Sequence, residues 1–171
     1  NDLEWDSVYV NSDENIFFDS MAFWDDQEGI AMGDATEECL SVIATRDGGK
    51  NWSLLDCSSL PSAVLDSAGH KEAAFAASNG NLVTQGDEVW MVSGGVASRV
   101  FHSSDRGHSW DVVNTPIMQG ETMTGMFSAT RCSDSENIGM AWGGDWDVMD
   151  DNSANKVHTR DGGKSWQLHM P

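Results

Sequence analysis

The sequence predicts an all-β fold, namely a β-propeller of four-stranded antiparallel blades, with about three blades and one outer strand forming a partial ring. A phrase of the form S/T-x-D-x-G-x-x-W occurs three times, and its aspartates, Asp47, Asp105 and Asp161, lie 58 and 56 residues apart. Such a period is typical of propellers and other repeat folds. Short apolar runs bounded by Gly, Asn, Asp and Ser lie between the phrases, without any sustained helical stripe. Runs of this kind favour strands, and four strands per repeat indicate a blade.

Each phrase predicts a tight turn that is locked by its own side chains. An Asp at this position accepts hydrogen bonds from backbone amides just ahead, the Gly supplies a positive φ, and the Trp packs back on the hairpin. One identical Asp per repeat favours this structural role over a set of catalytic carboxylates. The predicted turn residues are Asp47, Gly49, Trp52, Asp105, Gly107, Trp110, Asp161, Gly163 and Trp166.

The first blade is expected in residues 16–56. Its predicted strands are 20–24, 29–33, 40–44 and the segment that begins at Trp52. Residues 1–15 are expected to hold the outer strand of a preceding blade, at Trp5–Val10, and a connection. On this prediction the chain begins inside a blade whose first three strands it lacks.

Two further blades are expected, in residues 72–114 behind a leading loop at 57–71, and in residues 124–171 behind a leading loop at 115–123. The predicted strands of the second blade are 73–77, 89–94, 99–102 and the segment from Trp110, and those of the third include 125–129, 137–143 and the segment from Trp166. Open sheet edges invite association. We therefore expect a piece of a longer propeller of about six to eight blades, or a piece that another polypeptide completes.

The tryptophan-closed phrase resembles the Asp-box, the bacterial neuraminidase repeat found in sialidases and in photosystem II stability/assembly factor-like repeat proteins. The runs at 17–25, 29–34, 72–78 and 99–107 are similar to one subgroup of the latter. The resemblance implies a propeller that binds or scaffolds protein without catalysis and is secreted, periplasmic or in an organelle lumen. It implies as partner another protein or the remaining blades of the same propeller, and an association with a membrane complex.

Composition limits the partners further. The chain has 9 Lys and Arg against 28 Asp and Glu, which gives a net charge of −19. Long-range repulsion opposes binding to nucleic acid or to an anionic membrane surface. The charge favours either a soluble acidic surface or a cationic partner. No apolar run is long enough to span a bilayer, and no phosphate loop, nucleophile elbow or metal-ligand spacing appears, so we expect no cofactor and no metal.

Polar residues at the roots of long loops form the candidate ligand site. Asp34, Glu72, Arg99 and Asp145 are expected on the propeller face opposite the repeated phrases. Loops on a rigid scaffold are where such folds place function. The cluster would suit a cation or a polar ligand, but an arginine among carboxylates is also typical of a structural ion pair.

A sialidase-like or other carbohydrate-active enzyme, with part of its site in missing blades, is the alternative function. The sialidases that share this repeat use three arginines to bind the substrate carboxylate, a Tyr nucleophile with a Glu partner, and an Asp as the acid. This chain has a single tyrosine, Tyr9, and outside the phrases it offers only Arg99 and Arg131. No catalytic residue is therefore predicted.

The chain has three cysteines, Cys39, Cys57 and Cys132, so at least one is unpaired within the chain. Cys39 precedes the third strand of the first blade and Cys57 follows the fourth. A disulfide between them is geometrically conceivable, and the sequence leaves it open.

Overall fold

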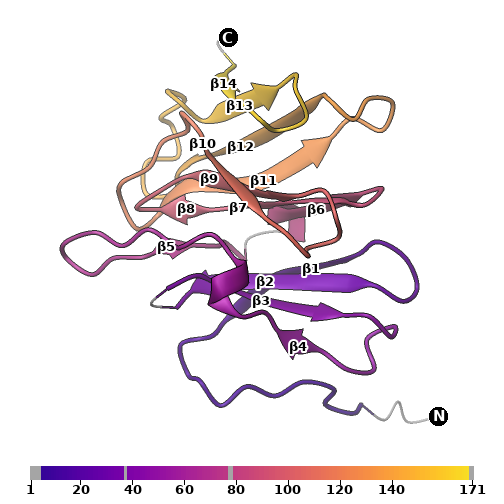
Figure 1. Cartoon of the computed structure of the whole chain (residues 1–171). Helices are drawn as coiled ribbons and strands as arrows, with labels where there is room; N and C mark the ends of the chain where they lie inside the picture. The colour runs from indigo at the N-terminus through magenta and orange to yellow at the C-terminus, as the bar shows by residue number, and fades with distance from the viewer. Residues whose placement is uncertain (1–4, 37, 77–78, 170–171) are drawn as a thin grey trace.

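A computed structural model describes residues 5–36, 38–76 and 79–169. Within these ranges the chain forms fourteen strands and two short 3-10 helices. The strands make three antiparallel sheets that are stacked on one another, with the first sheet at one end of the stack and the third at the other (Figure 1). The sheets do not close into a ring. The predicted fold class, an all-β partial propeller, is confirmed.

The first sheet has the order β1-β2-β3-β4 and lies within residues 16–56. It consists of β1 (Phe18–Phe23), β2 (Gly29–Ala35), β3 (Leu40–Thr45) and β4 (Ser53–Leu54). All six residues of β3 are buried, because this central strand has a sheet neighbour on each side and protein over both faces. The phrase that contains Asp47 joins β3 to β4, as predicted.

The second sheet has the order β10-β9-β7-β6. Its strands are β6 (Leu82–Gln85), β7 (Glu88–Val92), β9 (Arg99–Ser103) and β10 (Asp111–Asn114). The predicted inner strand at 73–77 is wrong, because β6 takes that place. Gln85 pairs directly with Glu88 across a two-residue turn at Gly86 and Asp87, where Gly86 has a φ of 61°. A Gly-Asp pair of this kind closes a tight hairpin.

The third sheet contains six strands in the order β14-β13-β12-β11-β8-β5. Four of them come from the last part of the chain, namely β11 (Thr124–Arg131), β12 (Gly139–Asp145), β13 (Lys156–Thr159) and β14 (Gln167–Leu168). The other two, β5 (Glu72–Ala73) and β8 (Gly94–Gly95), come from the second repeat. A Cβ on Gly94 would lie 2.5 Å from the Thr124 carbonyl oxygen, so this extension requires glycine.

Two apolar cores hold the stack together. Along β7 successive side chains point to opposite faces, so Val89 and Met91 join the core against the first sheet, and Trp90 and Val92 join the core against the third. All four side chains are fully buried. The second sheet is thus packed on both faces, as an internal blade is, while the first and third each have one outward face.

Residues 5–17 cross the outward face of the first sheet without forming a strand (Figure 1). The predicted outer strand at Trp5–Val10 is wrong. Trp5 is 88 % exposed and Val10 81 % exposed, so the apolar residues that suggested a strand find no sheet to join. A disulfide joins Cys39, just before β3, to Cys57 in the 3-10 helix η1 (Cys57–Ser59), and Cys132 is a free thiol.

Candidate functional site

The three repeated phrases form turns with the same hydrogen bonds. In each, the aspartate Oδ1 accepts from the amide four residues ahead, at 2.9 Å for Asp47, 2.8 Å for Asp105 and 2.9 Å for Asp161. Hydrogen bonds from the Ser165 hydroxyl and amide lower the pKa of Asp161 to about 2. A carboxylate held ionised in this way suits a turn lock and is a poor proton donor at neutral pH.

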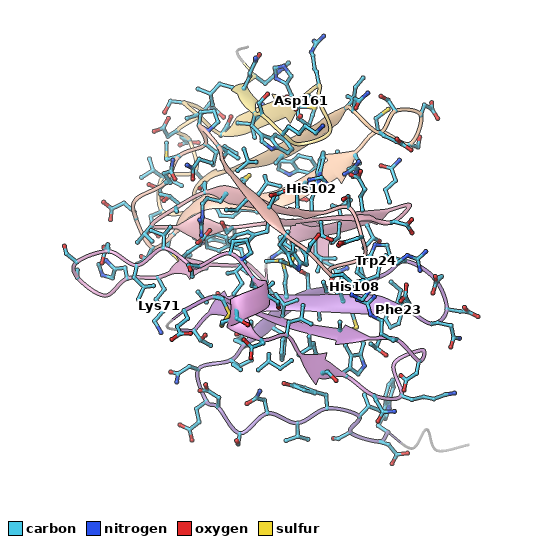
Figure 2. All side chains as sticks on the ribbon, in the orientation of Figure 1. Phe23, Trp24, Lys71, His102, His108 and Asp161 are labelled. Carbon is cyan, nitrogen blue, oxygen red and sulfur yellow. A yellow bond between two sulfur atoms is a disulfide. The ribbon has the colours of Figure 1, made fainter. Side chains whose placement is uncertain are left out.

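The tryptophans of the second and third phrases close their turns in the same manner. Trp110 Nε1 donates to the Gly107 carbonyl and Trp166 Nε1 to the Gly163 carbonyl, both at 3.1 Å. Trp52 differs, because it packs edge to face on Phe23 at 5.7 Å. Each aspartate stays in its own turn, and Asp161 lies on the third sheet, far from His108 of the second phrase (Figure 2). The three carboxylates therefore do not converge on one site.

Two of the four predicted site residues, Glu72 and Arg99, form a buried ion pair. Glu72 has no exposed surface. Its Oε1 accepts from Arg99 Nε at 3.0 Å and from the Ser93 hydroxyl at 2.5 Å, and its Oε2 accepts from Arg99 Nη2 and from the Val64 amide. Arg99 Nη2 also donates to the Ser62 carbonyl at 2.7 Å. The pair fastens the loop at 57–71 to β9, because this loop contributes the Ser62 carbonyl and the Val64 amide that bond to it.

The other two predicted residues lie apart from this pair. Asp34 Oδ1 accepts from the Ala74 amide at 3.0 Å, and burial raises the pKa of Asp34. Asp145 Oδ1 accepts from the Asp147 amide at 2.8 Å, at the end of β12. Within the described ranges no hydrogen bond or ion pair joins Asp145 to the other three. Glu72 and Arg99 are thus joined in an ion pair, whereas Asp34 and Asp145 make separate contacts.

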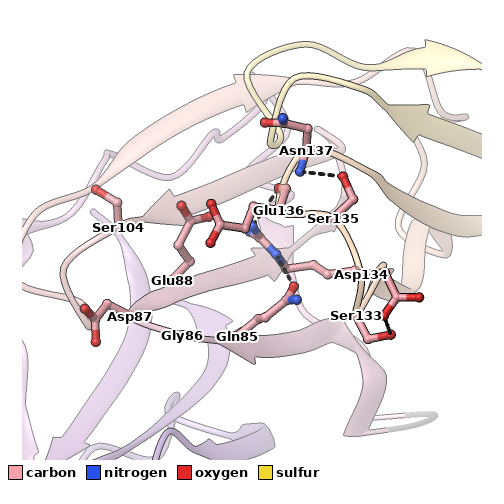
Figure 3. Close-up of a pocket in the computed structure, with 11 residues that line it drawn as sticks. Gln85, Gly86, Asp87, Glu88, Ser104, Ser133, Asp134, Ser135, Glu136 and Asn137 are labelled. Carbon is pink, nitrogen blue, oxygen red and sulfur yellow. Dashed lines mark hydrogen bonds and ion pairs between the residues drawn. The ribbon is translucent and has the colours of Figure 1, made fainter.

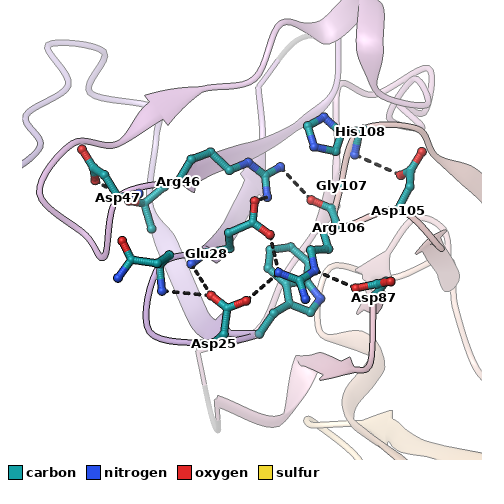
Figure 4. Close-up of polar contacts among 12 residues, drawn as sticks. Asp25, Glu28, Arg46, Asp47, Asp87, Asp105, Arg106, Gly107 and His108 are labelled. Carbon is teal, nitrogen blue, oxygen red and sulfur yellow. Dashed lines mark hydrogen bonds and ion pairs between the residues drawn. The ribbon is translucent and has the colours of Figure 1, made fainter.

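An arginine in the second phrase bridges the first and second sheets. The Arg106 guanidinium donates to Asp25 at 2.6 Å, to Asp87 at 2.7 Å and to Glu28 (Figure 4). Arg46 Nη2 donates to the Arg106 carbonyl at 2.8 Å from the first sheet. The sequence places both arginines in the turns but does not predict the network between them and the acidic side chains. The available signal is Arg106 itself, which stands where the other two phrases have glycine.

A cleft of about 660 Å³ lies at the corresponding boundary between the second and third sheets (Figure 3). It is lined by the β6–β7 turn at 85–88, by Ser104 and Arg131, and by the loop at 133–137. Ser104 belongs to the second phrase, so the cleft opens on the side of the phrases. The candidate ligand site predicted for the opposite face therefore does not include this cleft.

The floor of the cleft is a paired arginine and its rim is acidic. The Arg131 side chain is 2 % exposed, and its Nη1 lies 2.6 Å from Glu88 Oε2. Its Nε donates to Gln85 at 3.0 Å, and the guanidinium stacks over Trp90 at 4.2 Å. The lining also contains Asp87, which Arg106 already binds, and the exposed acids Asp134 and Glu136. Arg131 is the one cationic side chain of the lining, and Glu88 already pairs with it.

Features of a sialidase site are not assembled in this arrangement. Both arginines that lie outside the phrases, Arg99 and Arg131, are bound to acidic side chains of the protein. The Tyr9 hydroxyl accepts from Asn11 Nδ2 at 2.9 Å, and its ring packs against Phe18.

In the described ranges no three His, Cys, Asp or Glu side chains are grouped to hold a metal, and no helix has the length and apolarity to cross a membrane.

Comparison with known proteins supports the fold. No protein-family model matches the sequence, and no curated protein is significantly similar to it. Among solved structures, one described as YCF48 bound to D1 peptide is similar with a TM-score of 0.56 and 22 % identity over 89 % of this chain. The chain spans 39 % of the length of that solved chain. In fold, the chain is similar to this β-propeller over a part of its length.

Proposed function

We propose that this chain is a non-catalytic β-propeller module that binds a cationic segment of a protein partner, and that the cleft between the second and third sheets is the binding site. The observation that carries the proposal is the composition of this cleft. Three loops from two sheets surround it, and its rim presents Asp134 and Glu136 while its one arginine is paired with Glu88. Loops on a packed stack of sheets provide a rigid binding surface.

Size and charge support a peptide ligand. The cleft volume of about 660 Å³ lies within the range of about 300–1,000 Å³ that is usual for ligand pockets. The net charge of −19 steers cations toward the protein and repels anions. Lysine and arginine side chains of a partner would meet uncompensated carboxylates at the rim. The similar solved structure is itself described as a complex with a peptide, which supports the class of ligand.

The outward face of the third sheet supports membership in a larger ring or complex. Trp142 of β12 is 41 % exposed, and Ile138, just before β12, and Met149, in the loop after it, are 49 % and 77 % exposed. Exposed apolar side chains in and around one outer strand favour contact with another protein surface, either further blades or a partner in a membrane complex. The Cys39–Cys57 disulfide supports an oxidising compartment, such as the exterior, the periplasm or an organelle lumen.

The carbohydrate-active alternative receives less support. A sialidase-like site would need free arginines to bind the substrate carboxylate, whereas Arg99 and Arg131 are engaged in ion pairs. Turnover of a fluorogenic sialoside by the complete protein would overturn the non-catalytic proposal.

Fluorescence anisotropy with a labelled lysine-rich peptide, and with a serine-substituted peptide of equal length, tests the binding proposal. The lysine-rich peptide is expected to bind and to release as salt is raised, because surface charges are screened. The double variant Asp134→Asn, Glu136→Gln is expected to lose this binding. The matched control, Asp6→Asn with Glu14→Gln, removes the same charge from exposed residues of the N-terminal segment. Equal losses in the two variants would mean that only net charge matters, and the cleft assignment would fail.

A further inference from the structure

The outward face of the third sheet carries a row of basic side chains beside an exposed tryptophan. Val157 of β13 points to the core shared with the second sheet, so Lys156 and His158 point outward. Lys156 pairs with Trp142 of β12, which is 41 % exposed. Arg160, just after β13, lines one shallow hollow together with His158, and both Lys156 and Arg160 are exposed. This face is therefore partly apolar and partly basic, in a chain whose net charge is −19.

Lys156 distinguishes this face from the two boundaries inside the stack. It lies five residues before Asp161, at the place where the first phrase has Val42 and the second has Val100. Both valines are fully buried in the cores between neighbouring sheets. Within the described residues Lys156 makes no ion pair. A purely apolar surface on this face would bury its ammonium group without a partner, which is costly. The face thus fits a surface that brings carboxylates as well as apolar side chains.

The opposite end of the stack has this composition. The first 45 residues of the chain contain twelve Asp and Glu but no Lys or Arg. Asp6 and Glu14 lie in the segment at 5–17, which crosses the outward face of the first sheet, and both are exposed (Figure 1). Trp5 and Val10 of the same segment are exposed as well. The segment combines acidic and apolar side chains, as the third sheet combines basic and apolar ones.

The net negative charge does not prevent contact between these two surfaces. At an ionic strength of about 0.15 M, charges in water act over only about 8 Å. The repulsion between two acidic copies is therefore largely screened at a distance, whereas opposite charges in contact still attract. Apolar side chains on both surfaces supply affinity, and the charges fix which two surfaces meet.

We propose that the outward face of the third sheet binds the N-terminal segment of a second copy of this chain. Lys156 and Arg160 face the carboxylates of that segment, and Trp142 packs against its apolar side chains. The contact joins two different surfaces, so each pair of copies leaves one basic face and one acidic end free, and growth leads to a ring or a filament. The inference rests on the proposal above that the third sheet contacts another protein surface, and it names that surface.

Sedimentation velocity at an ionic strength of about 0.15 M tests this assembly. The 18.6 kDa chain is expected to form species of two or more copies as its concentration rises. Lys156→Glu is expected to weaken the association by about tenfold or more, because it sets like charges against each other. Lys50→Glu makes the same change of charge at an exposed residue of the first phrase and is expected to assemble still. A wild-type protein that stays a single chain up to about 1 mM, or equal losses in the two variants, would overturn the proposal.

A mixing experiment identifies the second surface. The double variant Asp6→Lys, Glu14→Lys is expected to lose self-association, as Lys156→Glu does. An equimolar mixture of the two variants is expected to associate again, because each keeps the native surface that the other has lost. A mixture that stays as single chains, or self-association by the double variant, would refute the N-terminal segment as the occupant. Both variants are expected to bind the lysine-rich peptide, so a failure of the assembly and a failure of the cleft give different results.

Discussion

Replacing Arg99 with methionine is expected to destabilise the protein strongly, because it leaves the Glu72 carboxylate buried without its cation. Glu72 is fully buried and accepts two bonds from the guanidinium. After the change it retains only the Ser93 hydroxyl and the Val64 amide. The guanidinium bond to the Ser62 carbonyl and its contact with the Phe101 ring at 5.0 Å are lost as well.

The magnitude follows from the burial of the pair. Removing one partner of a buried ion pair typically costs about 3–5 kcal/mol. With a urea dependence of about 2 kcal/mol per molar, the midpoint of unfolding is expected to fall by about 1.5–2.5 M. Circular dichroism and tryptophan fluorescence should report the same transition. The loss is expected to be smaller in acid, because the isolated carboxyl group can then fold in its neutral form.

The double variant Glu72→Leu, Arg99→Met provides the control. With both charges removed, no uncompensated buried charge remains, so the double variant is expected to be more stable than Arg99→Met alone. A double-mutant cycle then isolates the coupling between the two side chains. A loss below about 1 kcal/mol for Arg99→Met would be typical of an exposed pair and would refute the description of this pair as a buried fastening of the loop at 57–71.

Two further perturbations test other parts of the fold. Burial raises the pKa of Asp19 from 3.8 in the unfolded chain to about 7 in the folded protein. The folded state therefore holds this proton more tightly, and the resulting stability is fully present below about pH 4 and is lost as pH rises through 7. Asp19→Asn is expected to flatten that part of the pH profile of urea unfolding, and an unchanged profile would contradict the assignment. Arg106→Gly relieves a positive φ of 57° but removes the bonds to Asp25, Glu28 and Asp87. It is expected to lower the thermal midpoint at low salt and to differ less from the wild type at high salt, because salt screens exposed charges; a stabilising effect at low salt would show that backbone strain outweighs the network.

The repeat of the tryptophan-closed phrases predicts those strands that are marked by an apolar run or by a phrase next to them. The turns around Asp47, Asp105 and Asp161 contain their own bonding partners within a few residues, so their geometry follows from the phrase itself. The inner strand of the second sheet was misplaced because the apolar run around Phe75 repeats at the same spacing as Phe23 and Phe127. Which of two nearby runs joins a sheet is decided by long-range pairing, which local composition does not record.

The candidate sites depend on contacts between segments far apart in the sequence. Topology was enough to bring Glu72 near Arg99, but whether their polar atoms are satisfied depends on Ser62, Ser93 and Val64 from other segments. Asp19 is partly buried, and Asp34, from the neighbouring strand β2, lies near enough to act on its carboxyl group. In sequence it is one carboxylate among 28 acidic residues, and only its position inside an otherwise apolar run sets it apart.

One backbone position differs between the two boundaries of the second sheet. Arg106 and Gly162 follow the aspartate of the second and third phrases, and both have a positive φ, of 57° and 76°. Arg106 N donates to the Asp87 carbonyl, and Gly162 N donates in the same way to the Asn137 carbonyl. A Cβ on Gly162 would lie 3.6 Å from the Glu136 carbonyl oxygen, at the edge of the acidic cleft. The cleft is open where an equivalent arginine would have filled it.

Gly162→Arg is therefore expected to place a guanidinium in the cleft, as Arg106 does at the other boundary, and to abolish binding of the lysine-rich peptide. Gly48→Arg is the matched control, because Gly48 has the same φ of 76° in the first phrase and borders the β1–β2 turn instead of the cleft. It adds the same charge at the same φ, although its Cβ would lie 2.9 Å from the Asp26 carbonyl oxygen, closer than any contact at Gly162. Provided that circular dichroism shows a folded protein, its peptide affinity is expected to remain close to that of the wild type. If Gly162→Arg bound the peptide as tightly as Gly48→Arg, the peptide would have to bind elsewhere, since no cationic side chain can share the cleft with a guanidinium that already satisfies its carboxylates.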